Sequence, residues 1–233
     1  HLDSAEVQPK SDIDVNVSAR ISPRDLTYFF SDSIMNYFKN WETTEVGIHG
    51  YYSLEKGELK TLNLKTGNSA FHATGKVYDI WDLKKLNWRD VVIHTNVGSD
   101  FKNILTPFLG TINIPPDVTL DVKSYGDTKT INLDAKVFTT WGNVETVGSV
   151  TPQASGIGVD AQVTGKNIVP DAWLELPWLG PLNLSVDARA TIGDNPEMEI
   201  KGLISSVEIM DQTINSIALQ SSLRNDSLAT TLS

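Results

Sequence analysis

Polar and apolar residues alternate strictly over residues 182–192. Every even position in this run is apolar and every odd position is polar. Because successive side chains of a strand point to opposite faces, the run predicts a long β-strand with one apolar and one polar face. The same alternation recurs at 131–137, at 118–122 and at 62–64. The chain therefore predicts many such strands, whose apolar faces must be covered together.

A second pattern suggests an internal repeat. In three places an alternating strand is followed by a short apolar segment with helix signals. These places are 13–17 followed by 22–26, 91–97 followed by 99–101, and 159–163 followed by 169–173. We therefore expect three modules that share one continuous apolar groove: residues 1–90, 91–156 and 157–233.

The first of these segments predicts the longest helix of the chain. Ser22 is suited to cap it, Pro23 to the first helical position, and Asp25 to the positive end of the helix dipole. Apolar residues then recur at three- and four-residue steps from Leu26 to Trp41. The other two segments should be shorter, because Pro107 and Pro177 interrupt them.

The fold class follows from the short connections between strands. Turn signals such as Gly67-Asn68 separate neighbouring alternating runs, so consecutive strands should pair antiparallel. No strand–helix–strand rhythm of a parallel sheet is present. The sequence predicts an all-β fold of about a dozen antiparallel strands, with short amphipathic helices between some of them.

Composition narrows the class of partner. The chain has 233 residues, of which 40% are hydrophobic, and a net charge of −10. This acidic balance argues against nucleic acid, because phosphate binding needs a basic surface. No run approaches the roughly 20 apolar residues that a membrane helix needs. Because the chain starts at His1 and ends in a strand-like run, we expect it to be part of a longer protein.

The sequence offers no recognisable catalytic or metal-binding motif. Its four histidines, His1, His49, His72 and His94, lie far apart, and no HExxH motif or other paired-ligand spacing is present. No G-x-S-x-G nucleophile motif and no phosphate-cradling glycine loop occurs. Cysteine is absent, which excludes thiol chemistry. We therefore expect a protein that is not an enzyme, with no catalytic residues, no metal site and no cofactor.

Several segments together resemble the AsmA-like family, and within it the TamB (translocation and assembly module) type. Residues 21–26 resemble a segment common in TamB proteins of the Bacteroidota. The other segments that carry the resemblance are 58–65 with 71–77, and 180–193 followed by 198–204, 214–219 and 227–232.

The resemblance implies an elongated, half-open antiparallel sheet folded like a taco around an apolar groove. It also implies a role as an inner-membrane-anchored protein that bridges the periplasm, carries phospholipid toward the outer membrane and assists outer-membrane biogenesis. An outer-membrane barrel protein would be a partner through regions beyond this chain. The family's membrane anchor and extreme C-terminal region are not evident in this sequence, so the resemblance implies an internal fragment.

Alternation and resemblance together predict which side chains line the groove and contact phospholipid or another acyl lipid. They are the apolar-phase residues Leu62, Leu64, Val118, Leu120, Val122, Ile131, Leu133, Ala135, Val137, Leu182, Leu184, Val186, Ala188, Ala190, Ile192, Met198, Ile200 and Ile204.

Three other interpretations remain open from sequence. A structural or adhesive β-sandwich of the cell surface would cover its apolar faces with each other. An outer-membrane barrel would turn them to lipid, but the helical segment 26–41 and the irregular placement of aromatic residues fit that architecture poorly. An enzyme would need a site that no motif reveals.

Overall fold

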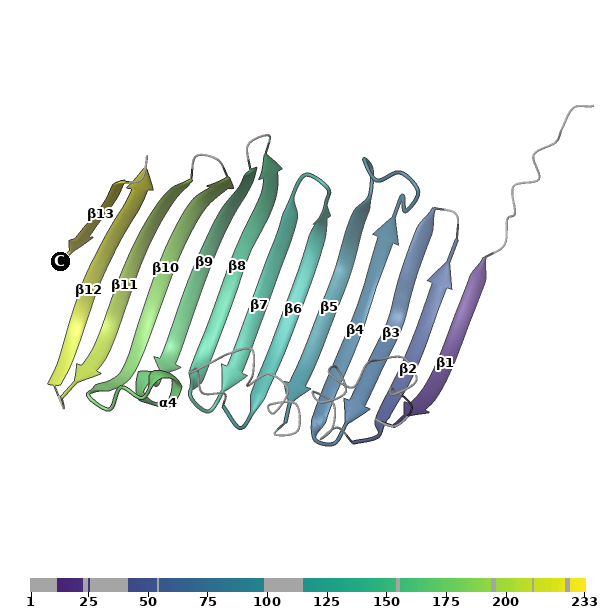
Figure 1. Ribbon diagram of the computed structural model, residues 1–233, viewed down its shortest axis with the longest axis horizontal. Helices are drawn as coiled ribbons and strands as arrows, with labels where there is room; N and C mark the ends of the chain where they lie inside the picture. The colour runs from purple at the N-terminus through teal and green to yellow at the C-terminus, as the bar shows by residue number, and fades with distance from the viewer. Residues whose placement is uncertain are drawn as a thin grey trace, which may run out of the picture.

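The structure is a computed structural model, shown in Figure 1. It describes residues 12–22, 25, 42–53, 55–98, 115–153, 156–193, 196–210, 212–224 and 227–233. The strands are β1 (Ile13–Ile21), β2 (Thr44–Tyr52), β3 (Lys56–Thr66), β4 (Ser69–Tyr78), β5 (Asn87–Val97), β6 (Val118–Asp127), β7 (Ile131–Thr139), β8 (Gly142–Gln153), β9 (Gly156–Ile168), β10 (Leu179–Gly193), β11 (Glu197–Ile209), β12 (Gln212–Arg224) and β13 (Ser227–Leu232).

These thirteen strands form one open sheet in which spatial order equals chain order. Each strand pairs antiparallel with the next, from β1 at one edge to β13 at the other (Figure 1). The sheet is not closed, since β1 and β13 lie at opposite ends of the row. The predicted all-β, antiparallel class is confirmed, and the described strands lie in one sheet rather than two.

Short hairpins explain the simple topology. Thr66 ends β3 and Ser69 begins β4, so only Gly67 and Asn68 form the turn, and Gly67 adopts a φ of 49°. Glycine reaches positive φ without a steric penalty, which suits it to such a tight turn. Two-residue connections force neighbouring strands to run antiparallel.

Longer connections recur every fourth strand, after β1, β5 and β9. Because the strands alternate in direction, all three leave the same end of the sheet. This arrangement follows the repeat expected from sequence, while the module boundaries stay a prediction. The predicted longest helix and the segment around Pro107 lie outside the described residues, apart from Ser22 and Asp25. There the Ser22 backbone N–H donates to Asp25 Oδ2 at 2.7 Å, a contact typical of a helix start.

The third long connection contains the helix α4 (Pro170–Leu174). Proline stands in its first turn, where a missing N–H costs nothing. Glu175 ends it with a left-handed φ of 56°, and its backbone N–H donates to the Asp171 carbonyl. The helix has only five residues and ends before Pro177, which agrees with the expectation that this proline prevents a longer one.

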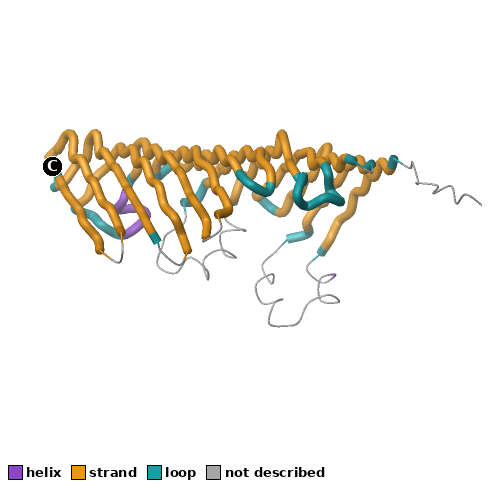
Figure 2. Tube along the Cα trace, turned by 90° about the horizontal axis from the view of Figure 1, so that it is seen from above, coloured by secondary structure: helices purple, strands orange, loops and turns teal. Residues whose placement is uncertain are grey.

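The sheet forms a single layer, and Figure 2 shows α4 on one side of it. A β-sheet normally buries its apolar face against a second layer. Here Ala73, Val97 and Val207 are the buried hydrophobic residues among those described, and each keeps some exposure. The protein therefore lacks a conventional core over the described part of the chain, and one broad apolar surface stays accessible.

Candidate lipid-binding surface

All eighteen residues predicted to line a groove lie on the same face of the sheet. Residues directly opposite each other on antiparallel strands share a face, so the strand register places these residues on one side of the sheet. Val186 lies opposite Val163 and Gly202, and Leu120 lies opposite Val137. We call this side the apolar face and the reverse side the polar face. The apolar face includes Leu62, Leu64, Val118, Leu120, Val122, Ile131, Leu133, Ala135, Val137, Leu182, Leu184, Val186, Ala188, Ala190, Ile192, Met198, Ile200 and Ile204.

One row of cross-strand neighbours runs across the whole apolar face. We call it the central row, and it takes one residue from each of the thirteen strands. At about 4.8 Å between strands, it extends over roughly 58 Å. Only Thr146 and Gly202 interrupt its apolar side chains. In order from β1 to β13 the row is Val17, Ile48, Leu62, Ala73, Ile93, Val122, Ala135, Thr146, Val163, Val186, Gly202, Leu219 and Leu232.

Large side chains on the apolar face are open to solvent. Leu133 is 40% exposed, Val17 is 49% exposed and Ile192 is 59% exposed. Neighbouring side chains cover one another from the sides, which is why most positions are half-buried rather than fully exposed. A contiguous apolar surface of this extent is rare on a soluble monomer and marks a site that binds another apolar partner.

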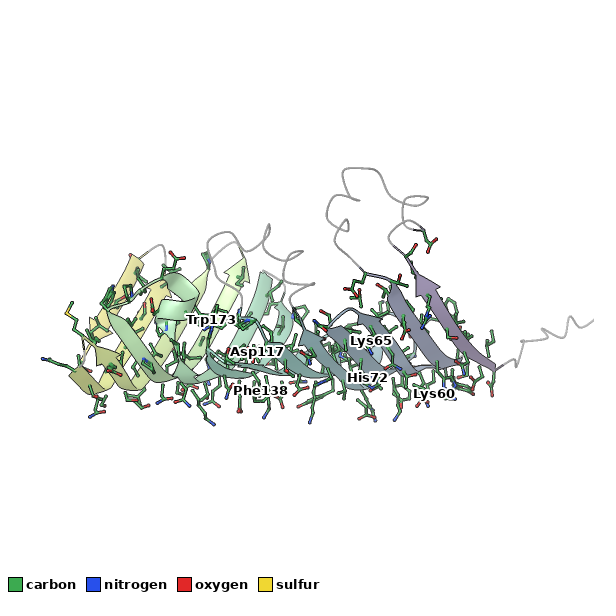
Figure 3. All side chains as sticks on the ribbon, turned by 90° about the horizontal axis from the view of Figure 1, so that it is seen from below. Lys60, Lys65, His72, Asp117, Phe138 and Trp173 are labelled. Carbon is green, nitrogen blue, oxygen red and sulfur yellow. The ribbon has the colours of Figure 1, made fainter. Side chains whose placement is uncertain are left out.

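Tryptophan-bearing segments lie near both ends of the strands. At one end Trp173 of α4 packs edge-on against Trp141, with ring centroids 5.7 Å apart, and its indole N–H donates to the Trp141 carbonyl. Figure 3 shows Trp173 on the opposite side of the sheet from the polar-face residues Lys60, His72 and Phe138. At the other end Trp81 packs edge-on against Tyr52, whose register places it on the apolar face. Trp41, at the end of the predicted long helix, lies outside the described residues.

The polar face carries cross-strand ion pairs instead. Arg20 binds Glu45 at 2.6 Å and Arg189 binds Asp160 at 2.9 Å. Asp14 accepts hydrogen bonds from Lys60 and His49, which lower the pKa of its carboxyl below the ordinary value. Lys201 likewise lowers the pKa of the Glu199 carboxyl. These groups satisfy one another and need no further partner.

A basic hollow of about 850 Å3 lies where β5 begins and β6 ends. Its two carboxylates are already engaged, because Asp90 accepts from Lys76 and Asp127 accepts the backbone N–H groups of Lys129 and Thr130. Those backbone donors lower the pKa of Asp127. Basic residues outnumber the carboxylates in the lining, although Lys85 is itself bound to Asp82 at 3.2 Å. The five basic residues of the hollow are Lys84, Lys85, Arg89, Lys123 and Lys129.

The described residues hold no group of three or more His, Cys, Asp or Glu side chains arranged to bind a metal ion. They also include no helix with the length and apolar character of a membrane span. His1 lies outside this part of the chain, and His49 is bound to Asp14. His72 and His94, in contrast, lie directly opposite each other on β4 and β5.

Sequence reasoning missed several apolar-face residues because β-bulges shift the alternation. Leu59 and Leu62 both face the apolar side although they are three residues apart, since a register shift separates them. The same happens between Ile204 and Val207, and Val207 is only 3% exposed. A bulge adds one unpaired residue and reverses the phase beyond it. Strand register alone reveals such a change.

No protein-family model, curated protein or solved structure matches this chain. The AsmA-like resemblance therefore stays a prediction.

Proposed function

We propose that the apolar face holds the acyl chains of phospholipids and that the protein transfers lipid without catalysing a reaction. The observation that carries this proposal is the central row, which offers apolar side chains on nearly every strand, with no second sheet above them among the described residues. Such a surface needs an apolar partner in water. An acyl chain is a partner that can cover part of it and leave again.

Energetics support both binding and movement. Each CH2 group removed from water contributes about 0.8 kcal/mol, so ten covered groups contribute about 8 kcal/mol before the cost of ordering the chain. Neighbouring strands present similar side chains in the central row. A chain that moves by one strand therefore exchanges one set of apolar contacts for an equivalent one. This equivalence favours conduction along the sheet over tight binding at a single place.

The basic hollow suits the phosphate of a lipid headgroup. Lys84 and Lys129 line it, and the hollow also borders Trp88, whose indole N–H donates to Ser124 on the apolar face. Arg89 and Lys123 lie on the polar face, so a lipid at this sheet end would bind its phosphate at Lys84 and Lys129 beyond the strand ends and pass its tails around the end of the sheet to the apolar face. Charge attraction then adds to the apolar contacts, with a strength that falls as salt rises.

We also propose that the sheet is folded into a half-open, taco-like shape. The segments bearing Trp81 and Trp173 would form the two walls of an apolar groove, with the central row as its floor. Taken with the AsmA-like resemblance, the role that fits is a segment of an inner-membrane-anchored bridge in the periplasm. It would carry phospholipid between the inner and outer membranes and contribute to outer-membrane biogenesis, with an outer-membrane barrel partner docking outside this chain.

The geometry favours this role over the structural or adhesive β-sandwich. A sandwich covers one apolar sheet with a second at a distance of about 10 Å. The described strands form one sheet, so a sandwich would require a second sheet from outside the described residues. Val186 would then contact protein rather than lipid, which gives the two roles different experimental signatures.

The test places a photocrosslinking residue at Val186 or at Asp187 in cells. These neighbours point to opposite faces: Val186 lies in the central row, and Asp187 lies opposite Lys201 in the strand register on the polar face. We expect lipid adducts at Val186 and none at Asp187. Equal lipid adducts at both positions, adducts at neither, or protein adducts alone at Val186 would overturn the proposal. Mass spectrometry of the adducts identifies the lipid.

A further inference from the structure

Two histidines come together on the polar face at the middle of the sheet. His72 of β4 and His94 of β5 are direct cross-strand partners, although 22 positions separate them in the sequence. Directly opposite residues on antiparallel strands have Cβ atoms about 4.5–5.5 Å apart and side chains on the same side. Both imidazoles therefore lie side by side on the polar face.

Hydrogen bonds fix the same tautomer in both rings. His72 Nδ1 lies 2.6 Å from Asn63 Oδ1, and His94 Nδ1 lies 2.5 Å from Asp121 Oδ1. An amide oxygen and a carboxylate oxygen only accept hydrogen bonds, so each Nδ1 carries the proton. In the neutral ring the lone pair then lies on Nε2. A ligating histidine is commonly oriented in this way, by an oxygen acceptor behind its other nitrogen.

The surroundings leave room for an ion. The His94 side chain is 52% exposed and that of Asp121 is 43% exposed. The positions that flank the pair on β4 and β5 are Ala70 opposite Asn96 and Thr74 opposite Val92, none of them charged. The nearest polar-face cations on the outer strands are Lys65 on β3, and Lys123 and Lys136 on β6 and β7. Lys136 is bound to Glu145, and Asp121 brings a negative charge behind His94.

We propose that His72 and His94 form a two-histidine site for a divalent first-row transition ion such as Zn2+, with Asn63 and Asp121 as positioning residues. Zinc binds imidazole nitrogen at about 2.0–2.1 Å, so the two Nε2 atoms must approach within roughly 3–4 Å of each other. Because Asn63 and Asp121 lie on the outer neighbours β3 and β6, zinc binding would require both imidazoles to rotate so that their Nε2 atoms meet between the two Cβ positions. Water completes the coordination, and the ion links β4 to β5.

His49 provides the matched control. It lies on the same polar face, opposite Thr61 and Asn16. Its Nε2, the atom that is free in the other two rings, is 2.9 Å from Asp14 Oδ1 and 3.3 Å from Lys60 Nζ. No histidine lies opposite His49, and its Nε2 is already engaged by Asp14 and Lys60, so it lacks the facing pair of imidazoles on which the proposed site depends. Its replacement should change the surface chemistry without changing zinc binding.

The experiment titrates Zn2+ into the full chain by calorimetry. Every sample carries His1→Ala, so that His72, His94 and the control His49 are the histidines that remain. We expect one ion per chain. His72→Asn and His94→Asn should each weaken binding at least tenfold, while His49→Asn leaves it unchanged. Circular dichroism of each variant checks that the sheet persists. Unchanged affinity in His72→Asn or His94→Asn, or an equal loss in His49→Asn, overturns the site.

A second readout separates ligation from a structural effect. Nitrogen-15 spectra of the imidazoles should show Zn2+ shifting Nε2 of His72 and His94, while both Nδ1 atoms stay protonated. Zinc should also raise the melting temperature of the unmodified chain but not that of His94→Asn, because an ion that binds only the folded sheet stabilises it. Zinc shifts at Nδ1, or stabilisation that survives His94→Asn, would contradict the proposal.

Discussion

The two faces of this sheet differ in whether their side chains find partners within the sheet. On the polar face, charged neighbours from adjacent strands bind each other, as Arg189 binds Asp160. On the apolar face, the central row has neighbours to its sides, and the described strands place no second sheet above it. Both faces are built from the same strands, one residue out of phase. The difference shows that an alternating sequence can pair the charged groups of one face while the other face keeps apolar side chains exposed to solvent.

Placing a negative charge on either face tests the contrast between them, and we expect the largest effect of all the predictions on bound lipid. Val186→Asp puts a carboxylate in the central row, where covering it with acyl chains is costly without a paired cation. Lipid that co-purifies with the chain should fall about tenfold or more, since 1.4 kcal/mol already corresponds to a factor of ten. Ser185→Asp, one residue away on the polar face, should retain lipid at the normal level. Lipid content is measured by mass spectrometry of an organic extract, and equal losses in both variants would remove the distinction between the faces.

Two glycines of the apolar face test how tightly the sheet itself is packed. A Cβ on Gly148 would lie 2.6 Å from the Asp160 carbonyl oxygen, whereas the nearest atom to a Cβ on Gly202 is Leu219 Cβ at 3.6 Å. Gly148→Ala should therefore lower the free energy of unfolding by about 1–3 kcal/mol through backbone displacement. Gly202→Ala should be neutral or stabilising by up to about 1 kcal/mol, because it restricts the unfolded chain. Urea midpoints measure both, and a larger loss in Gly202→Ala would contradict the register.

A charge reversal in the basic hollow sharpens the proposed role of the headgroup. Lys129→Glu should reduce binding to vesicles that contain anionic phospholipid by a few-fold, with little change for zwitterionic vesicles. Lys166→Glu makes the same change of charge on β9, opposite Asn143 and away from the hollow. Vesicle co-sedimentation at low and high salt compares the two variants. Equal losses would indicate a general charge effect rather than a headgroup site.

Acid should reduce the stability that the ion pairs of the polar face contribute. We expect this effect to be smaller than those of the substitutions above. The pKa values of Asp14 and Glu199 are lowered in the fold by their lysine neighbours, from ordinary values of 3.8 and 4.5. A lowered folded pKa means that this stabilisation is complete above the unfolded value and is lost as pH falls through the folded value. The urea midpoint should therefore decline below about pH 4.5. These groups are exposed, so salt should reduce the effect. Asp14→Asn should flatten the decline, and an unchanged pH profile would show that the pair contributes nothing.

Alternation by itself determined the faces of the strands. Leu184, Val186 and Ala188 could be assigned to one side because a strand has a period of two residues. The same reasoning gave the all-β class and the antiparallel pairing, because the connections are short. It also indicated the short third helix, which Pro177 limits. These features depend on local backbone geometry, and local sequence carries that information.

Tertiary structure decided what depends on register. Leu59 and Val207 joined the apolar face only because bulges reverse the phase of their strands. His72 and His94 became neighbours because β4 pairs with β5 in one particular alignment, and no spacing in the sequence marks that contact. That the described strands form one open layer, rather than two stacked sheets, was equally undetermined, because the same alternation suits both. Register and layering arise from the summed packing of whole strands, so no short segment of the sequence specifies them.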